Sequence, residues 1–428
     1  MKVHFTNAKI MSMAKGADLF EGDLITEGDR IVYCGPSLEH GDELAQGCDR
    51  VINAGGNLLM PGFKNAHTHS AMTFLRSFAD DMPLDRWLNE QVFPREAKLT
   101  GEDIYWLSKL AFLEYLTSGT TACFDMYFGL DDMTAAAQEY GFRTVFCGSI
   151  NRFGGTVQGL ADDHGKYNHV GSLISHRLGF HAEYTTDLSM MQELAELART
   201  LKEPVYTHIC ETRHEVEGCI ERYGKTPPEL MDSLGLFDYG GGGFHCVHFT
   251  QRDRAIFAEK GVYAVTNPAS NLKLASGIAD LTAMACAGVK MAIGTDGPAS
   301  NNCLDMFREM FLAAGLQKVQ QENASAMPAA TVLDMATCQG ARAMGLMDCD
   351  CLAVGKMADL IVIDLQRPNM QPLNNIAANL VYSGSKENVK LTMIGGKILY
   401  EDGTFFVGEE PPIVYEQANR IIRRIVAQ

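Results

Sequence analysis

Two histidines, His67 and His69, stand one residue apart at the end of an apolar run. Side chains alternate along a strand, so residues two apart lie on the same face, and both imidazoles could reach one metal ion. By itself such a pair is more often part of a packed core than a metal site. Its interpretation therefore depends on the other polar residues of the chain.

A third histidine, His208, follows another strand-like run, and Glu211 comes three residues later. No second histidine lies one helical turn away, as a helical zinc pair would require. One interpretation is a histidine within a sheet and a solvent-exposed glutamate at a helix start. The functional interpretation makes His208 a third metal ligand and Glu211 a carboxyl group that moves protons beside the ion.

His245 and His248 share one short run, and Asp296 closes another, directly before Gly297. Alternation places the two histidines on opposite faces, so we expect His245 to point inward and His248 to be packed or exposed. An aspartate before glycine is usually a turn residue. At the end of a buried strand, however, its carboxylate needs a metal ion or a proton donor.

These residues must be positioned by a repeating unit, because strand-like runs alternate with helical patterns through the middle of the chain. The predicted strands are 58–69, 121–128, 144–150, 177–181, 204–209, 243–249, 261–267 and 290–295. The clearest predicted helices are 103–118, 188–202, 252–260, 305–319 and 328–343. Eight strands separated by helices predict a parallel (β/α)8 barrel of the TIM type.

Most of the predicted strands finish on a polar residue that could do chemistry. These residues are His67 and His69, Asp125, His181, His208, His245, Asn267 and Asp296. The carboxyl ends of barrel strands converge on one mouth, where active sites lie. The pattern therefore predicts one site that collects these side chains.

The two ends of the chain carry short alternating strands instead, with a Gly395-Gly396 hairpin signal near the second end. Neither end is long enough for a core of its own, so we expect them to pack together as one small β-sandwich. The predicted domains are residues 1–58 for the first part of the sandwich, 59–350 for the hydrolase barrel, and 351–428 for its second part with a C-terminal helix.

The charge and the cysteine content of the chain limit the classes of partner and the compartment that we expect. Lys and Arg number 36 against 53 Asp and Glu, a formal net charge of −17, which disfavours nucleic acid and anionic membranes. The 12 cysteines form no CxxC pairs, and no export signal or membrane-length apolar run is evident, so we expect free thiols and a cytoplasmic protein. A homo-oligomer is the common default.

Several segments together resemble the amidohydrolase superfamily: PGFKNAHTH at 61–69, HICE at 208–211, HCVH at 245–248 and GTDG at 294–297. Longer segments narrow the resemblance to the methylthioadenosine/S-adenosylhomocysteine deaminases and their chlorohydrolase relatives. They are DDMPL at 80–84, WL at 87–88, EAKL at 96–99, SNLKLASG at 270–277, SNNCLDM at 300–306 and GKMADL at 355–360. The resemblance runs nearly from end to end.

The resemblance implies one divalent metal ion per chain, usually zinc, although iron and manganese suit the same ligand types. The implied ligands are His67, His69, His208 and Asp296. It further implies that Glu211 shuttles protons, that His245 orients the hydrolytic water and that Asp296 helps to accept its proton.

The resemblance also implies how a nucleoside would be bound. Glu96 would hold the ribose hydroxyls, His181 would touch the purine, and Trp87 would help to wall the pocket. Arginines grip the amino-acid tail of S-adenosylhomocysteine in some members, and neither Arg143 nor Arg152 can be matched to them from the sequence.

We therefore expect hydrolytic deamination of an adenosine-type nucleoside: S-adenosylhomocysteine, methylthioadenosine, 5′-deoxyadenosine or adenosine. The alternative is a deaminase or chlorohydrolase acting on a free ring such as guanine, a pterin or a triazine. Two further alternatives are weaker. A two-metal cyclic-amide hydrolase would commonly use a bridging lysine where His181 stands, and a binding protein with a dead site would lack a ligand or the proton carrier.

Overall fold

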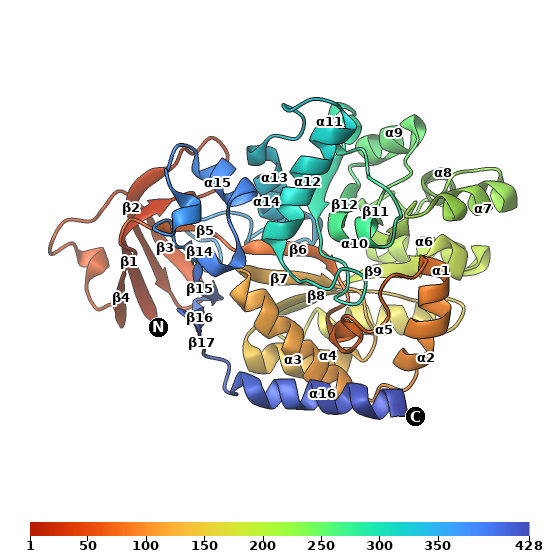
Figure 1. Cartoon of the computed structure of the whole chain (residues 1–428), viewed down its shortest axis with the longest axis horizontal. Helices are drawn as coiled ribbons and strands as arrows, with labels where there is room; N and C mark the ends of the chain where they lie inside the picture. The colour runs from red at the N-terminus through yellow and green to blue at the C-terminus, as the bar shows by residue number, and fades with distance from the viewer. Residues whose placement is uncertain (428) are drawn as a thin grey trace.

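The computed structural model describes residues 1–427, and eight parallel strands form its centre (Figure 1). They are β6 (Phe63–Thr68), β7 (Thr120–Asp125), β8 (Arg143–Cys147), β9 (Ile174–Ala182), β10 (Val205–Ile209), β11 (Gly241–His245), β12 (Tyr263–Thr266) and β13 (Lys290–Ile293). Their order in the sheet follows their order in the sequence. The predicted (β/α)8 barrel is confirmed.

The first and last strands are brought together just beyond β13. The backbone N–H of Asp296 donates to the carbonyl of His67 at 3.0 Å, and the N–H of Thr295 donates to the side chain of Asn65 at 2.8 Å. These bonds join the end of β13 to β6, so the sheet is nearly closed. They also bring Asp296 beside His67, although the two are 229 positions apart in the sequence.

Helices surround the barrel (Figure 1). They are α1 (Leu84–Arg86), α2 (Phe93–Glu96), α3 (Gly101–Thr117), α4 (Leu130–Tyr140), α5 (Val157–Tyr167), α6 (Leu188–Leu201), α7 (Arg213–Tyr223), α8 (Pro227–Leu234), α9 (Gln251–Lys260), α10 (Pro268–Lys273), α11 (Leu281–Cys286), α12 (Met306–Gln320), α13 (Ala329–Ala336), α14 (Cys338–Ala343), α15 (Ile376–Tyr382) and α16 (Pro411–Ala427). Three of them begin with a capping box, at Thr100, Thr226 and Thr250, in which side chains satisfy the first backbone N–H groups.

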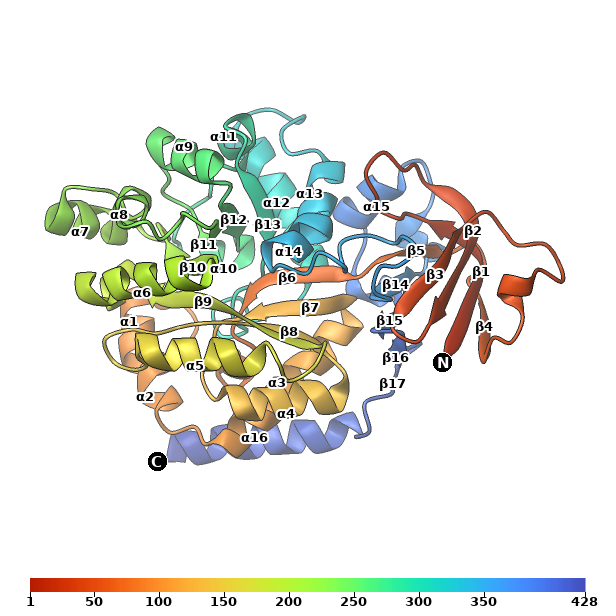
Figure 2. The ribbon, with the colours of Figure 1, turned by 180° about the vertical axis from the view of Figure 1, so that it is seen from behind.

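The strands of both chain ends form a second sheet beside the barrel (Figure 2). They are β1 (Lys2–Ile10), β2 (Phe20–Glu27), β3 (Arg30–Gly35), β4 (Arg50–Asn53), β5 (Leu58–Pro61), β14 (Leu360–Ile363), β15 (Val389–Ile394), β16 (Lys397–Glu401) and β17 (Thr404–Phe405). The two ends join where β5 pairs with β14. The expected small β unit built from both ends is confirmed.

This terminal sheet curls around its own apolar core, which includes Phe5, Leu24 and Leu391. Its distant turns meet, because a Cβ atom added at Gly396 would lie 1.8 Å from the carbonyl oxygen of Gly28. Gly395 and Gly396 both have positive φ, as the predicted hairpin between β15 and β16 requires.

Two predicted elements are each divided in the structure. The predicted strand 58–69 breaks at Gly62, where a Cβ atom would lie 2.1 Å from the side chain of Thr121, so β5 joins the terminal sheet and β6 the barrel. The predicted helix 328–343 breaks at Thr337, whose hydroxyl donates to the carbonyl of Leu333. The first break depends on a close approach of the backbone to Thr121, which the apolar pattern does not encode.

The C-terminal helix α16 packs along α3. Its buried residues Val414, Ala418, Ile421 and Ile425 recur at helical spacing and form one apolar face. Arg424 pairs with Asp103, and Lys98 donates to the carbonyl of Ile425 at 3.2 Å. Within residues 1–427, no helix is both long enough and apolar enough to cross a bilayer.

Candidate active site

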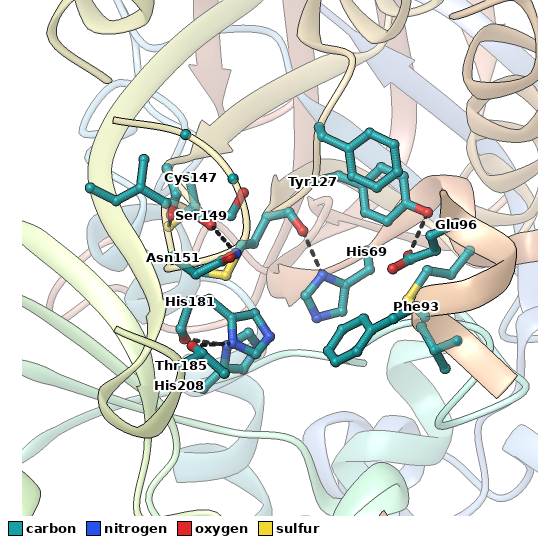
Figure 3. A pocket seen from close by; sticks show the side chains of 18 of the residues that line it. His69, Phe93, Glu96, Tyr127, Cys147, Ser149, Asn151, His181, Thr185 and His208 are labelled. Carbon is teal, nitrogen blue, oxygen red and sulfur yellow. Dashed lines mark hydrogen bonds between the residues drawn. The ribbon is translucent and has the colours of Figure 1, made fainter. Parts of the chain in front are cut away.

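A large cavity opens at the carboxyl ends of the barrel strands (Figure 3). Its volume is about 1060 Å³, at the upper end of the range for small-molecule sites. Histidines from four different strand ends lie in or beneath it, together with Glu211 and Asp296. We call this cavity the pocket.

His67 and His208 face each other at its base. Their Nε2 atoms are 3.1 Å apart, and the His67 ring stacks on Phe244 with 3.8 Å between ring centres. The Nδ1 atom of His208 lies 2.7 Å from the carbonyl oxygen of His181. Nδ1 therefore carries the proton, and Nε2 of His208 presents a lone pair to His67.

His69 and Asp296 complete the base. The Nε2 atom of His69 lies 3.2 Å from Oδ1 of Asp296, and its Nδ1 donates to the carbonyl of Met126. The other carboxylate oxygen of Asp296 accepts hydrogen bonds from the hydroxyls of Ser270 and Ser300. His69 and Asp296 are thus each oriented by a further hydrogen bond, as the ligands of protein metal sites usually are.

His245 and Glu211 stand beside this base. Nδ1 of His245 lies 2.8 Å from the Oδ1 atom of Asn271, which fixes the proton on Nδ1 and leaves Nε2 as the acceptor. Nε2 lies 3.8 Å from Glu211, whose carboxyl accepts a hydrogen bond from Ser276. Burial raises the pKa of Glu211, so its protonated form is favoured relative to an exposed glutamate.

The backbone at these strand ends is unusual. His245 and Asp296 have φ values of 74° and 58°, and Cys210, between His208 and Glu211, has a φ of 51°. Left-handed backbone at non-glycine residues is unfavourable, and it persists only where surrounding contacts fix it, often at functional sites.

The base of the pocket has the donor set for a divalent cation. Two groups of nitrogen and carboxylate atoms lie within 4.8 Å of one another, His67 with His208 and His245, and His67 with His69 and Asp296. Burial lowers the pKa of His67 to about 3, so its ring is neutral, as a metal ligand must be. Nε2 of His67 faces the lone pair of His208 Nε2 and lies 3.6 Å from Oδ1 of Asp296, an arrangement of acceptors that a cation would satisfy.

The walls contain the residues that the sequence associates with a nucleoside. Trp87 is buried in the lining, and Glu96 accepts a 2.7 Å hydrogen bond from the hydroxyl of Tyr127 (Figure 3). Burial raises the pKa of Glu96, and the hydrogen bond from the Tyr127 hydroxyl offsets only part of this rise. His181 on the opposite wall pairs with the hydroxyl of Thr185, and burial lowers its pKa to about 4.

Other polar residues at strand ends do not reach the pocket. Asp125 accepts hydrogen bonds from the backbone N–H of Ser70 and thus holds the loop after His69. Asn267 is buried outside the lining, and His248 packs against the carbonyl of Ser276, as expected for the outward-facing histidine of its run.

The two arginines left open by the sequence also lie outside the lining. Arg143 forms a buried pair with Asp359, and Arg152 is exposed, with its guanidinium donating to the carbonyl of Tyr184. The pair with Asp359 joins the barrel to the terminal sheet, outside the lining of the pocket.

Sequence reasoning missed the residues that support the site. Asn271, Ser270 and Ser300 orient His245 and Asp296, and Glu215 accepts hydrogen bonds from the backbone N–H groups of Cys210 and Glu211. The first three fall in segments 270–277 and 300–306, which carry the family resemblance. Their hydroxyl and amide groups gave no signal by spacing alone.

Comparison with known proteins agrees with this geometry. Residues 58–399 match the family described as the amidohydrolase family. The chain is 42% identical to a 5-methylthioadenosine/S-adenosylhomocysteine deaminase of Moorella thermoacetica, over 91% of this chain and 92% of the relative. It is 40% identical to the protein of the same name from Desulforudis audaxviator, over 100% and 99%.

Solved structures with similar folds include a deaminase and a chlorohydrolase. An adenosine deaminase from Xanthomonas campestris, solved with bound zinc, matches with a TM-score of 0.93 and 33% identity over 100% of this chain and 99% of the other. An atrazine chlorohydrolase from Arthrobacter aurescens matches with a TM-score of 0.89 and 20% identity over 98% and 100%, which supports the fold alone. The amidohydrolase family is metal-dependent. The chain belongs to this family and, within it, to the methylthioadenosine/S-adenosylhomocysteine deaminases, as a hydrolytic deaminase.

Proposed function

We propose that this protein removes the 6-amino group of an adenosine-type nucleoside by hydrolysis. The substrate would be methylthioadenosine, S-adenosylhomocysteine, 5′-deoxyadenosine or adenosine, and the products an inosine-type nucleoside and ammonia. The observation that carries this proposal is that one pocket holds both a metal donor set and Glu211, a buried carboxyl group outside that set. The names of the relatives point to the same reaction.

In this proposal His67, His69, His208 and Asp296 hold one divalent cation, most simply zinc. When bound, such an ion supplies a Lewis acid that lowers the pKa of water from 15.7 to about 7. His245 accepts a hydrogen bond from the reacting water through Nε2 and orients it toward carbon 6 of the purine. Asp296 accepts the proton that the water loses.

Glu211 completes the proton balance. Its carboxyl group donates a proton to the ring nitrogen beside carbon 6 as the new carbon–oxygen bond forms, which removes the developing negative charge. Glu211 then relays the proton held by Asp296 to the departing amino group, which leaves as ammonia when the carbon–nitrogen bond breaks. It recovers its own proton from the hydroxyl group on carbon 6 as the carbonyl of the product forms. Glu96 accepts hydrogen bonds from the ribose hydroxyls, His181 contacts the purine, and Trp87 forms part of the apolar wall.

The direct test is a substrate panel with metal-loaded protein. We expect ammonia and the matching inosine product from at least one of methylthioadenosine, S-adenosylhomocysteine, 5′-deoxyadenosine and adenosine. A chelator should abolish the activity, and added zinc should restore it. Absence of ammonia from all four nucleosides would refute the proposal.

Glu96 separates this proposal from a deaminase of free rings. A Glu96→Gln variant should lose at least about tenfold in kcat/KM on ribosides, because the charged acceptor for the ribose hydroxyls is gone. It should change little on guanine, a pterin or a triazine. Equal losses on ribosides and free rings would remove Glu96 from the ribose site.

A further inference from the structure

The pocket extends well past the residues expected to hold the purine and the ribose of the substrate. Beyond Glu96 and His181 it continues over residues 129–132, at the start of α4, to Asp163 and Tyr167 of α5 and to His176 of β9. We call this part the outer end of the pocket. With the purine near Glu211 and the ribose near Glu96, the outer end is the part of the pocket that remains for a 5′-substituent.

The lining of the pocket is negatively charged. Its carboxylate residues are Glu96, Asp131, Asp132, Asp163, Glu211 and Asp296, and no lysine or arginine among residues 1–427 lines it. Lys166 is nearby but pairs with Asp131, which also accepts a hydrogen bond from Tyr167. Asp163 is half-buried, and within the described chain its carboxylate has no hydrogen-bond partner.

An independent observation, an unsatisfied buried side chain, concerns the same end of the pocket. His176 is 0% exposed, and neither of its ring nitrogens has a hydrogen-bond partner in the described structure. Its ring lies against Tyr167 and His164. Burial lowers the pKa of His176 to about 3, so one ring nitrogen is an acceptor and the other a donor. Buried polar atoms without partners are uncommon unless a ligand or water completes them.

Neither Arg143 nor Arg152 neutralises the negative charge of the lining, because each is bonded to another group. Arg143 is held by Asp359 through two bonds of 2.6 and 3.0 Å. Arg152 is exposed and outside the lining, and its guanidinium donates to the carbonyl of Tyr184 at 2.7 Å. A carboxylate entering the outer end would therefore lose hydration without gaining a cation that is not already paired.

We propose that the outer end of the pocket takes the 5′-substituent and selects neutral or ammonium-bearing substituents against those that carry a carboxylate. Asp163 and His176 are the residues that determine this specificity. Asp163 balances an ammonium group and disfavours a carboxylate, and His176 accepts a hydrogen bond from the ammonium group or from a hydroxyl. An unpaired charge facing the wrong ligand is an effective means of discrimination. This inference rests on the proposed deamination of nucleosides.

The test compares three substrates that differ only in the 5′-substituent: methylthioadenosine, S-adenosylhomocysteine and its decarboxylated analogue, 5′-(3-aminopropylthio)adenosine. We expect kcat/KM for S-adenosylhomocysteine to be at least about tenfold lower than for the other two, a difference that corresponds to about 1.4 kcal/mol. Equal or higher kcat/KM for S-adenosylhomocysteine would overturn the inference and leave the deaminase proposal intact. No turnover of any nucleoside would refute the deaminase proposal itself.

Single substitutions test which residues determine the preference among the three 5′-substituents. Asp163→Asn should raise kcat/KM for S-adenosylhomocysteine and lower it for the aminopropyl analogue, each taken relative to kcat/KM for methylthioadenosine. Asp162→Asn is the matched control, because Asp162 is exposed on the same helix and outside the lining. Arg152→Gln should leave all three values unchanged. A selective loss on S-adenosylhomocysteine in Arg152→Gln would show that Arg152 recruits the carboxylate and would overturn the inference.

Discussion

At the scale of single residues, the site depends on side chains whose environment changes their ordinary chemistry. Glu211 is buried beside His245, and burial raises its pKa. Glu211 is also held outside the cluster of imidazoles and Asp296 by Ser276 and by the backbone contacts of Glu215. A carboxyl group in this position can deliver a proton instead of binding a cation.

Glu211→Gln should therefore lower kcat by about 10²- to 10⁴-fold, the usual contribution of a positioned acid–base group. The bound metal per chain should not change, because the amide leaves the imidazoles and Asp296 in place. Kinetics and metal analysis on the same preparations test this. Glu217→Gln, on an exposed position of α7, is the control; a large loss of metal in Glu211→Gln would contradict the proton-transfer role.

His176 predicts a pH dependence of stability. Burial lowers its pKa to about 3 in the folded protein, whereas an unfolded histidine has a pKa near 6.5. Between these values the unfolded chain binds the extra proton, so stability falls as the pH falls below about 6.5. Each such group changes the free energy of unfolding by up to about 1.4 kcal/mol per pH unit.

His176→Gln should remove that share of the slope, measured by urea unfolding of the whole protein between pH 7 and pH 5. His214→Gln, at an exposed histidine, should leave the slope unchanged. The slope is the readout, because the level of stability also reflects how well the new side chain fits. An unchanged slope in His176→Gln would mean that His176 is not buried in its neutral form.

At the scale of elements, short helix α10 controls two residues of the site at once. The hydroxyl of Ser270 donates a hydrogen bond to Asp296, and the side-chain oxygen of Asn271 accepts a hydrogen bond from Nδ1 of His245. Asn267 and Pro268 start this helix directly after β12, so the strand sets its position. The helix thus fixes the orientation of a carboxylate and the tautomer of an imidazole.

Asn271→Ala should lower kcat by about 10- to 100-fold, as expected for a partner that orients a histidine in a metal site. The KM for the nucleoside should change little, because Asn271 does not line the pocket. Leu272→Ala on the exposed side of α10 is the control. Equal effects of the two substitutions would indicate general damage to the helix and not the orientation of His245.

At the scale of the whole molecule, the barrel and the terminal sheet are joined by a buried ion pair. Arg143 begins β8, and Asp359 directly precedes β14 and also accepts the backbone N–H of Gly395. Both side chains are almost completely buried. A buried charge that loses its partner is strongly destabilising.

Arg143→Met should therefore lower the free energy of unfolding by about 3–5 kcal/mol, because Asp359 is left as an unpaired buried charge. The double variant Arg143→Met/Asp359→Leu should recover part of this loss. Arg30→Met removes an exposed pair with Asp348 and should cost at most about 1 kcal/mol. Urea unfolding compares the three; a loss below about 1 kcal/mol in Arg143→Met would show that Asp359 does not need the arginine.

Much of this architecture could be predicted from the sequence because it depends on local patterns. Apolar runs alternating with helical segments predicted the barrel, and polar residues at the ends of those runs predicted where His67, His69, His208 and Asp296 would gather. Strand alternation also distinguished His245 from His248. These inferences needed only the period of a strand and the convergence of parallel strands at one edge.

The sequence by itself determined the barrel, the sheet shared by both ends and the set of side chains available for chemistry, since these follow from periodicity along the chain. Only the tertiary structure decided what each side chain contacts. It turned Asp125 toward the backbone of Ser70, paired Arg143 with Asp359 and left the ring nitrogens of His176 at the outer end of the pocket without hydrogen-bond partners. The physical reason is that hydrogen bonds and ion pairs act over a few ångströms between segments far apart in the chain, and only the folded chain brings them within that range.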